Sequence, residues 1–389
     1  MKKIVFCLQT MVLGGVEKEL IAVLKKIHGD FDITLLLLHL EDTEIIKEIP
    51  DGVKIQVVGI DKTYYLGSTA ALIRQRVKRG RFAEAASVAL KRSLRIGMSA
   101  SNLNFDEIPP LAGSYDVAIC YHIHSPLALR YVAEKIRAQK KIGWIHNDFY
   151  VTGYPIHRLK KYVTAYDEFV AVSKKVEREF RSLCPWYRGG ISTAYNYLDA
   201  DEIRARSKCA IEDRVFLQEQ STKILTIGRF VEQKGIDQAI LVCAKLKERH
   251  LNFHWFLIGY GPLEHTYREL IEQYDVADRF TILGKKENPY PYINSCEIYV
   301  QPSRHEAFPL VPMEAKILRT PVICTNYDGA DEQVNNGVDG MIVPLNDVPA
   351  LCEAISCLIA SPETRERFSR ELEKWSADDD LQRIIHHFV

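Results

Sequence analysis

Short, almost uniformly apolar runs alternate with segments of helical periodicity along nearly the whole chain, and this alternation limits the possible folds most strongly. The runs lie at 3–8, 33–38, 53–58, 117–120, 141–145 and 168–172, and again at 224–227, 253–258, 280–283, 298–301, 322–324 and 341–343. Strands this apolar belong to parallel sheets that helices cover on both faces. We therefore predict an α/β protein with two doubly wound, Rossmann-like domains.

The domain boundary is expected in the polar stretch 196–221, which has few apolar residues and is typical of a linker. We assign 1–196 to the first domain and 197–377 to the second, and the tail 378–389 could pack back on the first. A chain of 389 residues is long enough for two such domains.

Formal charges cancel over the whole chain, with 51 lysines and arginines against 51 aspartates and glutamates. This balance argues against a generally basic nucleic-acid-binding protein. Residues 1–200 carry 29 basic and 21 acidic side chains, so the first half is positive and the second half negative. The two halves are therefore expected to face different partners.

A basic segment interrupts the alternation in the first domain, within a predicted helical insert at about 64–105. Residues 72–96 hold eight lysines and arginines and the single acid Glu84, interleaved with apolar residues. One interpretation is a solvated helix pair. The other is a surface that docks on anionic lipid headgroups, where each basic residue contributes about 1 kcal/mol. A nucleic-acid surface is not expected, because stacking aromatic residues are not interleaved.

Cysteine usage and the N-terminus bear on the compartment. The nine cysteines are scattered without a C-x-x-C pair, which is typical of free thiols in a reducing compartment. The first residues lack a signal-peptide pattern, and the longest apolar stretch, 33–38, is far shorter than the roughly 20 residues that span a bilayer. We expect a cytoplasmic protein, peripheral on the inner face of the membrane.

Two glutamates, Glu306 and Glu314, follow the predicted strand 298–301 and are eight positions apart. The prolines between them predict a helix that begins near Leu310. Glu306 then lies in the entry loop and Glu314 just inside the helix, where free backbone amides could bind a diphosphate. A carboxylate offers two acceptors to the vicinal hydroxyls of a ribose. Alternatively, both acids only favour the helix start.

A second candidate loop, Gly228-Arg229 to Lys234-Gly235, also joins a strand to a helix. Arg229 and Lys234 would lie at the carboxyl edge of the sheet, where open α/β sheets bind ligands. Two cations there could neutralise a diphosphate as a bond to it breaks, although basic loop residues are often surface decoration. Gly259 follows another strand, in a pattern that favours a tight turn.

In the first domain, Gly14 and Gly15 follow the first strand, and His146 and Asp148 end another. Glycine lets the backbone approach a substrate closely. The pattern is not G-x-G-x-x-G, so a nicotinamide-dependent dehydrogenase is disfavoured. His146 places an imidazole at the carboxyl edge, in either a structural or a functional role.

Taken together, these residues resemble the family-4 class of retaining glycosyltransferases with the GT-B fold, in which two Rossmann-like domains face a cleft. The resemblance covers essentially the whole chain. It is carried by the E-x7-E motif Glu306 to Glu314, Gly228-Arg229 with Lys234-Gly235, Gly14-Gly15, His146, the helix start Val172-Ser173, and Asn196 after a strand.

The resemblance implies a role for each matching residue. Arg229 and Lys234 would bind the donor diphosphate, Glu314 the ribose, and Glu306 a donor-sugar hydroxyl, while His146 would line the sugar pocket. The catalytic set is Glu306, His146, Arg229 and Lys234; the donor-binding set adds Gly14, Gly15, Gly259, Ala307, Phe308, Pro309, Leu310 and Glu314; Asn196, Asp148 and Ser173 line the substrate. Two departures matter, because Ala307 stands where glycine is common and Pro309 lacks an amide hydrogen.

The implied activity is a retaining transfer from a nucleoside-diphosphate sugar, with UDP favoured, to a lipid-linked glycan in surface polysaccharide synthesis. The first domain would take the acceptor and the second the donor. No cofactor or metal is expected: the D-x-D pairs Asp30/Asp32 and Asp199/Asp201 fall at structural positions, and His122 and His124 lack a third zinc ligand. Alternatives are a sugar-nucleotide epimerase of the same fold and a non-catalytic, nucleotide-sugar-binding partner subunit of another transferase.

Overall fold

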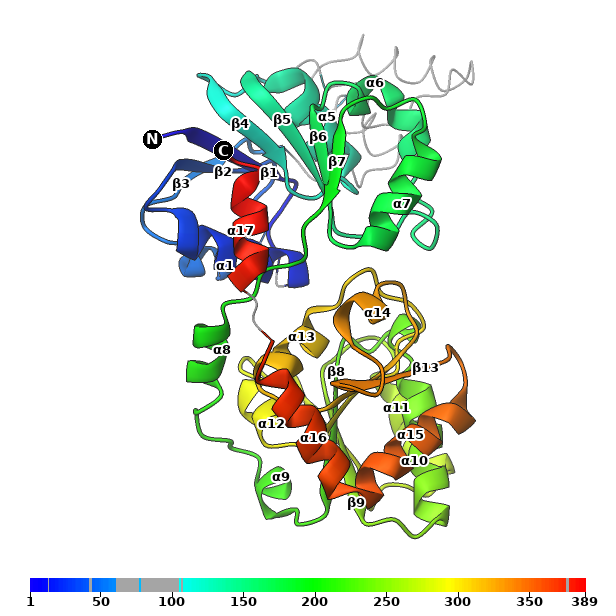
Figure 1. The fold of residues 1–389 in the computed structure, drawn as a ribbon. Helices are drawn as coiled ribbons and strands as arrows, with labels where there is room; N and C mark the ends of the chain where they lie inside the picture. The colour runs from blue at the N-terminus through cyan, green and yellow to red at the C-terminus, as the bar shows by residue number, and fades with distance from the viewer. Residues whose placement is uncertain (13, 42–43, 61–76, 78–104, 106–107, 376–377) are drawn as a thin grey trace.

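The structure is a computed structural model that describes all residues except 13, 42–43, 61–76, 78–104, 106–107 and 376–377. The predicted insert at about 64–105, with the basic segment 72–96, lies almost entirely outside the described residues. The described residues form two parallel-sheet domains, stacked one above the other in Figure 1. This is the predicted α/β architecture.

The first domain is built on a seven-stranded parallel sheet in the order β3-β2-β1-β4-β5-β6-β7. Its strands are β1 (Lys3–Leu8), β2 (Asp32–Leu37), β3 (Lys54–Val57), β4 (Tyr115–Cys120), β5 (Ala138–Ile145), β6 (Glu168–Ala171) and β7 (Gly190–Thr193). Its helices are α1 (Gly15–Ile27), α5 (Pro126–Lys135), α6 (Lys160–Val163) and α7 (Lys174–Leu183), with 3₁₀ turns at Ile45–Glu48 and Ile156–Leu159.

The second domain repeats the design with a six-stranded sheet in the order β10-β9-β8-β11-β12-β13. Its strands are β8 (Thr222–Ile227), β9 (Phe253–Ile258), β10 (Phe280–Gly284), β11 (Ile298–Gln301), β12 (Val322–Thr325) and β13 (Gly340–Val343). Its helices are α8 (Ala200–Arg206), α9 (Arg214–Gln218), α10 (Ile236–Glu248), α11 (Glu264–Gln273), α12 (Tyr290–Asn294), α13 (Leu310–Ile317), α14 (Ala330–Gln333), α15 (Val348–Ala360) and α16 (Pro362–Leu372), with a 3₁₀ turn at Glu232–Lys234.

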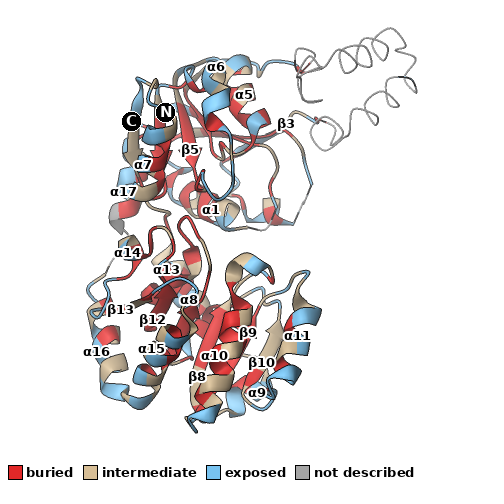
Figure 2. Ribbon diagram, turned by 90° about the vertical axis from the view of Figure 1, so that its right-hand side faces the viewer, coloured by how far each residue is buried: buried red, intermediate tan, exposed pale blue. Residues whose placement is uncertain are grey.

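Both faces of the central strands are buried, which explains why these strands are apolar without alternation. Along β1, the side chains of Ile4, Phe6 and Leu8 enter one hydrophobic core, whereas Val5 and Cys7 enter the core on the opposite face. In Figure 2 the central strands are accordingly coloured mostly as buried, and the outer faces of the helices as exposed. This double burial makes each sheet a rigid platform for the loops at its edge.

The last helix, α17 (Asp378–His386), returns to the first domain (Figure 1). Beyond it, Phe388 is fully buried and contacts the rings of Phe6, Phe31 and Trp144 at centroid distances of 5.6, 6.2 and 6.3 Å. The adjoining His387 pairs with Glu168 at 2.9 Å. The C-terminal residues therefore complete the core of the domain that the N-terminal residues begin.

In each sheet, the chain first adds strands on one side of that domain's first strand and then adds the later strands on the other side. This change of side lies between β1 and β4 in one sheet and between β8 and β11 in the other. Loops after neighbouring strands diverge at such a point and leave a crevice at the carboxyl edge, where open α/β sheets bind ligands. The geometry of these two edges therefore decides whether the predicted site residues meet.

Candidate active site

The carboxyl edges of the two sheets face each other, because loops from both edges touch across the domain interface. A Cβ added to Gly15, at the start of α1, would lie 3.5 Å from Leu310 Cδ1 of the second domain. Asn196 Nδ2 donates a hydrogen bond to the carbonyl oxygen of Phe308 at 3.2 Å. The predicted residues Gly15, Asn196, Phe308 and Leu310 are thus brought together.

Lys234 and Glu306 form an ion pair between the loop after β8 and the loop after β11. Lys234 Nζ lies 2.5 Å from Glu306 Oε1. The same oxygen accepts hydrogen bonds from Ser303 Oγ at 2.7 Å and Gln301 Nε2 at 3.0 Å. None of the described groups donates to Glu306 Oε2, so one carboxylate oxygen is held and the other is available.

Backbone constraints bring these two loops together. Gly235 follows Lys234 with φ +63°, and a Cβ there would collide with the carbonyl oxygen of Pro302. Glycine adopts this left-handed conformation without steric cost, so the close approach requires it. Arg229 is exposed beside Gly228, where an added Cβ would lie 3.4 Å from the Lys234 side chain. Both predicted cations therefore belong to one loop at the sheet edge.

Glu314 lies on α13, which begins at Leu310 as predicted. Its side chain is buried, and Tyr290 Oη donates to Glu314 Oε1 at 3.4 Å. Burial raises the pKa of Glu314 above its ordinary value, while Lys18, the bond from Tyr290 and Arg206 partly oppose that shift. The carboxylate is thus an acceptor whose charge only a few nearby groups compensate.

A cavity of about 520 Å³ opens beside Glu314, between the two domains. Its lining includes Lys18 on α1, Arg206 on α8, and Lys285 and Lys286 after β10. Pockets of this size hold small organic ligands. The lining also carries the carboxylates of Glu44, Glu48, Asp199, Glu202 and Glu287, so basic and acidic side chains are mixed around Glu314. Such a lining suits a ligand that is rich in hydroxyl groups.

His146 lies at the end of β5, and its ring is 4.9 Å from the ring of Tyr121. Burial is the main cause that lowers the pKa of His146 well below its ordinary value, so the imidazole is neutral at neutral pH. Its Nε2 atom and Asn196 Oδ1 are buried without a hydrogen-bond partner among the described groups. The Asn196 side chain interacts with His146 and partly opposes this lowering of the pKa, so the two buried polar groups are neighbours at this edge.

The loop from Ala307 to Leu310 offers backbone groups to both domains. The carbonyl oxygen of Pro309 accepts from Gln333 Nε2 at 2.8 Å, and Ala307 and Phe308 are buried. Pro309 is the N-cap of α13, and the first-turn amides that follow it have no intrahelical partner. The helix start can therefore contribute Leu310 N–H and its neighbour, whereas Pro309 itself contributes none.

Four predicted site residues have mainly structural surroundings. Asp148 Oδ1 accepts from Val151 N at 2.7 Å and so shapes the loop after β5. Ser173 is fully buried and caps α7 by accepting a hydrogen bond from Val176 N. Its hydroxyl therefore does not face a substrate, which differs from the expectation that Ser173 lines the substrate. Gly259 is required because a Cβ there would collide with the carbonyl oxygen of the neighbouring strand end, which agrees with the tight-turn interpretation. Gly14 is the N-cap of α1.

The D-x-D pairs also have structural partners. Asp32 pairs with Lys54 at 2.6 Å, and Asp199 caps α8 and pairs with Lys26 at 2.8 Å. Within the described part of the chain, no group of three or more histidine, cysteine, aspartate or glutamate side chains could hold a metal ion. No helix among the described residues is long and apolar enough to cross a membrane.

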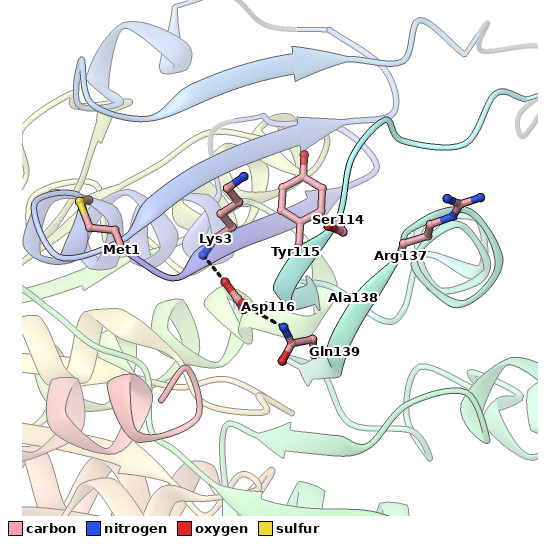
Figure 3. Close-up of a pocket in the computed structure, with 8 residues that line it drawn as sticks. All are labelled: Met1, Lys3, Ser114, Tyr115, Asp116, Arg137, Ala138 and Gln139. Carbon is pink, nitrogen blue, oxygen red and sulfur yellow. Dashed lines mark hydrogen bonds between the residues drawn. The ribbon is translucent and has the colours of Figure 1, made fainter.

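A second cavity, of about 530 Å³, lies at the opposite edge of the first sheet (Figure 3). Residues at the amino ends of β1, β4 and β5 line it, and Asp116 bridges Lys3 N and Gln139 Nε2 at 2.8 and 3.0 Å. The predicted site residues follow the carboxyl ends of strands. This cavity is therefore separate from the candidate active site.

Sequence reasoning missed several residues that complete the site. Gln301 and Ser303 orient Glu306, and Tyr290 contacts Glu314. Gln301 ends a predicted strand, and Ser303 follows it at the same edge, so their position was a usable signal. Contacts between distant elements, such as that from Tyr290 on α12, have no local signature.

Comparison with known proteins matches the second domain to one family. Residues 209–375 match the family described as glycosyl transferases group 1. An alpha-D-kanosaminyltransferase of Streptomyces kanamyceticus is 28% identical over 175 residues, which is 44% of this chain and 45% of that protein. The capsular polysaccharide biosynthesis glycosyltransferase CapM of Staphylococcus aureus is 32% identical over 141 residues, 36% of this chain and 37% of that protein. The chain thus spans less than half the length of these relatives.

Solved structures match over the whole chain. HepE of Anabaena, in complex with UDP and glucose, superposes with a TM-score of 0.72 at 18% identity and covers 100% of this chain and 99% of that chain. TarM of S. aureus superposes with a TM-score of 0.70 at 14% identity and covers 99% of both chains. At these identities the likeness shows the fold, which is the predicted GT-B fold.

Proposed function

We propose, from the premise that this chain belongs with the group 1 glycosyltransferases of GT-B fold, that it is a retaining, metal-independent enzyme using a nucleoside-diphosphate sugar. The observation that carries the proposal is the pairing of Lys234 with Glu306 at the carboxyl edge, with the buried Glu314 eight residues further on. Two loops and the helix α13 thus hold a cation for a diphosphate, a carboxylate for a sugar and a carboxylate for a ribose.

The roles follow from charge and geometry. Arg229 and Lys234 stabilise the diphosphate, whose negative charge grows as its bond to the sugar breaks. Glu306 keeps Oε2 for a sugar hydroxyl, because the described donors occupy Oε1. Glu314 accepts from the ribose hydroxyls beside the 520 Å³ cavity. The neutral His146 offers Nε2 to the sugar from the first domain.

Transfer would proceed on the face that the diphosphate leaves. The acceptor hydroxyl oxygen forms a bond to the anomeric carbon as the bond from that carbon to the diphosphate oxygen breaks. The acceptor proton passes to the departing phosphate oxygen, so the products are a glycoside and a nucleoside diphosphate. Configuration is retained because attack and departure share one face, and a separate protein base is not required.

We favour UDP as the nucleotide and a lipid-linked glycan in surface polysaccharide synthesis as the acceptor. HepE and TarM are similar in fold and are described with UDP, and CapM is a capsular polysaccharide enzyme. The basic segment 72–96 supports docking on an anionic membrane. Binding to vesicles that contain anionic lipid should therefore weaken as the salt concentration rises. Failure of the protein to bind such vesicles at low salt would contradict the proposed membrane docking.

A nucleotide-binding screen tests the donor assignment. Thermal shift and calorimetry with UDP, GDP, ADP and dTDP, each with and without EDTA, should show stabilisation by UDP that EDTA leaves unchanged. Binding of none of the four would remove the donor site from the proposal. Stabilisation that EDTA abolishes would contradict metal independence.

The role of Glu314 can be tested with a variant and through the pH dependence of UDP binding. Glu314→Gln should weaken UDP binding about tenfold, because a bond to a charged acceptor is lost. Since the pKa of Glu314 is raised, protonation begins at a higher pH than for an exposed glutamate. UDP affinity of the natural chain should therefore fall as the pH is lowered, and this fall should be smaller in Glu314→Gln, where the titration of the terminal phosphate of UDP remains.

The matched control is Glu287→Gln, which removes an exposed carboxylate from the lining of the same cavity. It should leave both affinity and pH dependence unchanged in calorimetric titrations between pH 8 and about pH 5. Equal behaviour of the two variants would mean that Glu314 does not contact the nucleotide.

A further inference from the structure

We propose that Glu332 is a positioning residue that latches the second domain onto the start of α7 in the first domain and thereby holds the loop 306–310 in its working position. Glu332 lies on the short helix α14, away from the residues assigned to the donor. The inference rests on the proposed donor site, because the held loop contains Glu306.

The carboxylate of Glu332 serves as an N-terminal cap supplied by the other domain. Its Oε2 accepts from Lys174 N at 2.8 Å and its Oε1 from Lys175 N at 3.2 Å. The local cap, Ser173 Oγ, accepts a hydrogen bond from Val176 N at 3.2 Å. It does not bond the amides of Lys174 and Lys175, which Glu332 binds instead. First-turn amides have no intrahelical partner, and a carboxylate there also meets the positive end of the helix dipole.

The segment that follows β7 in the first domain takes part in the same contact. Tyr195 Oη donates to Glu332 Oε2 at 3.0 Å. Its ring stacks on Phe308 with the centroids 5.0 Å apart and the planes 13° apart. Glu332 is therefore joined to the first domain through α7 and, through Tyr195, to the loop that carries Glu306.

The loop before Glu332 packs directly between α7 and the donor loop. A Cβ added to Gly329, where φ is +80°, would lie 3.1 Å from the carbonyl oxygen of Ala307 and 3.6 Å from Ser173 Cβ. Asp328 adds an ion pair with Lys175. A displacement of α14 would thus move the backbone that supports Glu306, which couples closure of the domains to the geometry of the site.

Chain neighbours provide a matched control. Asp331 is adjacent to Glu332, carries the same charge and is exposed. Asp331→Ala removes a carboxylate from the same helix without touching α7, whereas Glu332→Ala removes the cap. Glu332→Gln keeps one acceptor oxygen and loses the charge, so its effect should fall between those of the other two.

The first readout is hydrogen exchange of the amides of Lys174 and Lys175 in the ligand-free protein. Glu332→Ala should speed exchange at these two amides by about tenfold or more, the equivalent of one lost bond to a charged group. Asp331→Ala should leave them unchanged, and Val176 should stay protected in both variants because Ser173 remains. Unchanged exchange at Lys174 and Lys175 in Glu332→Ala would overturn the latch.

The second readout separates turnover from donor binding. Glu332→Ala should lower kcat by about tenfold with the UDP dissociation constant within about threefold of the natural value, because the latch positions the loop. Tyr195→Phe should produce the same pattern more weakly. Natural kcat in Glu332→Ala would overturn the positioning role. Failure of the natural chain to bind UDP would instead overturn the donor proposal. The hydrogen-exchange result would still test whether Glu332 binds the start of α7.

Discussion

Replacement of Lys234 by methionine is expected to reduce turnover by about 10²- to 10³-fold, the range typical of losing one preorganised group that stabilises transition-state charge. Lys234 is the cation that lies 2.5 Å from Glu306, the proposed sugar contact. Methionine keeps most of the side-chain length and removes the charge. The measurement is the steady-state release of UDP from a UDP-sugar, with the enzyme saturated in donor.

The double variant Lys234→Met/Glu306→Gln separates catalysis from stability. Lys234→Met alone leaves the buried Glu306 carboxylate without its counter-charge, which should lower the free energy of unfolding by about 1–2 kcal/mol. Glu306→Gln removes that uncompensated charge, so the double variant should recover stability but not turnover. Recovery of turnover would show that Lys234 acts only by stabilising the fold.

An exposed lysine serves as the charge control. Lys374 pairs with Glu371 on the surface, at 2.7 Å, and contributes nothing to the site. Lys374→Met should leave turnover unchanged and stability within about 0.5 kcal/mol. Comparable losses of turnover in both lysine variants would contradict the local role assigned to Lys234.

Phe388→Ala is expected to destabilise the protein by about 3–5 kcal/mol, the usual cost of truncating a buried aromatic side chain. Phe388 fills a space between Phe6, Phe31 and Trp144 in the core of the first domain. Its loss leaves a cavity among rings that cannot collapse easily, because both faces of the sheet are packed. Equilibrium unfolding in urea, followed by tryptophan fluorescence, would measure the change.

The neighbouring residue supplies the control. Val389 is 75% exposed, so Val389→Ala should change the free energy of unfolding by no more than about 0.5 kcal/mol. Equal stability of the two variants would mean that the C-terminal residues do not complete the core of the first domain in solution.

The fold was predictable because its central strands are buried on both faces. Each predicted apolar run coincides with a strand, and β1 has the predicted limits Lys3–Leu8. The missed strand, β7 (Gly190–Thr193), is the edge strand beside β6 and is only partly buried. An edge strand that packs weakly needs no apolar run, so hydrophobic pattern does not reveal it.

The candidate site was predictable only where function follows a strand end. Glu306, Arg229 and Lys234 could be placed because strand and helix signals flank them. Ser173 was assigned to the substrate, yet a serine at a helix start is equally suited to capping, which is its role here. Glu332 was not singled out, because its importance arises from α7, more than 140 residues earlier in the chain, and local sequence carries no sign of that contact.

The return of the C-terminal residues affects the order in which the protein can mature during synthesis. Strands β1 to β7 leave the ribosome long before Phe388. The side chains of Phe6 and Trp144 therefore lack their contacts with Phe388 while the whole second domain is synthesised. Domains otherwise tend to fold in the order of their synthesis. Here the first domain is synthesised first, but its core is completed last. The first domain can therefore fold completely only after the second domain has been translated.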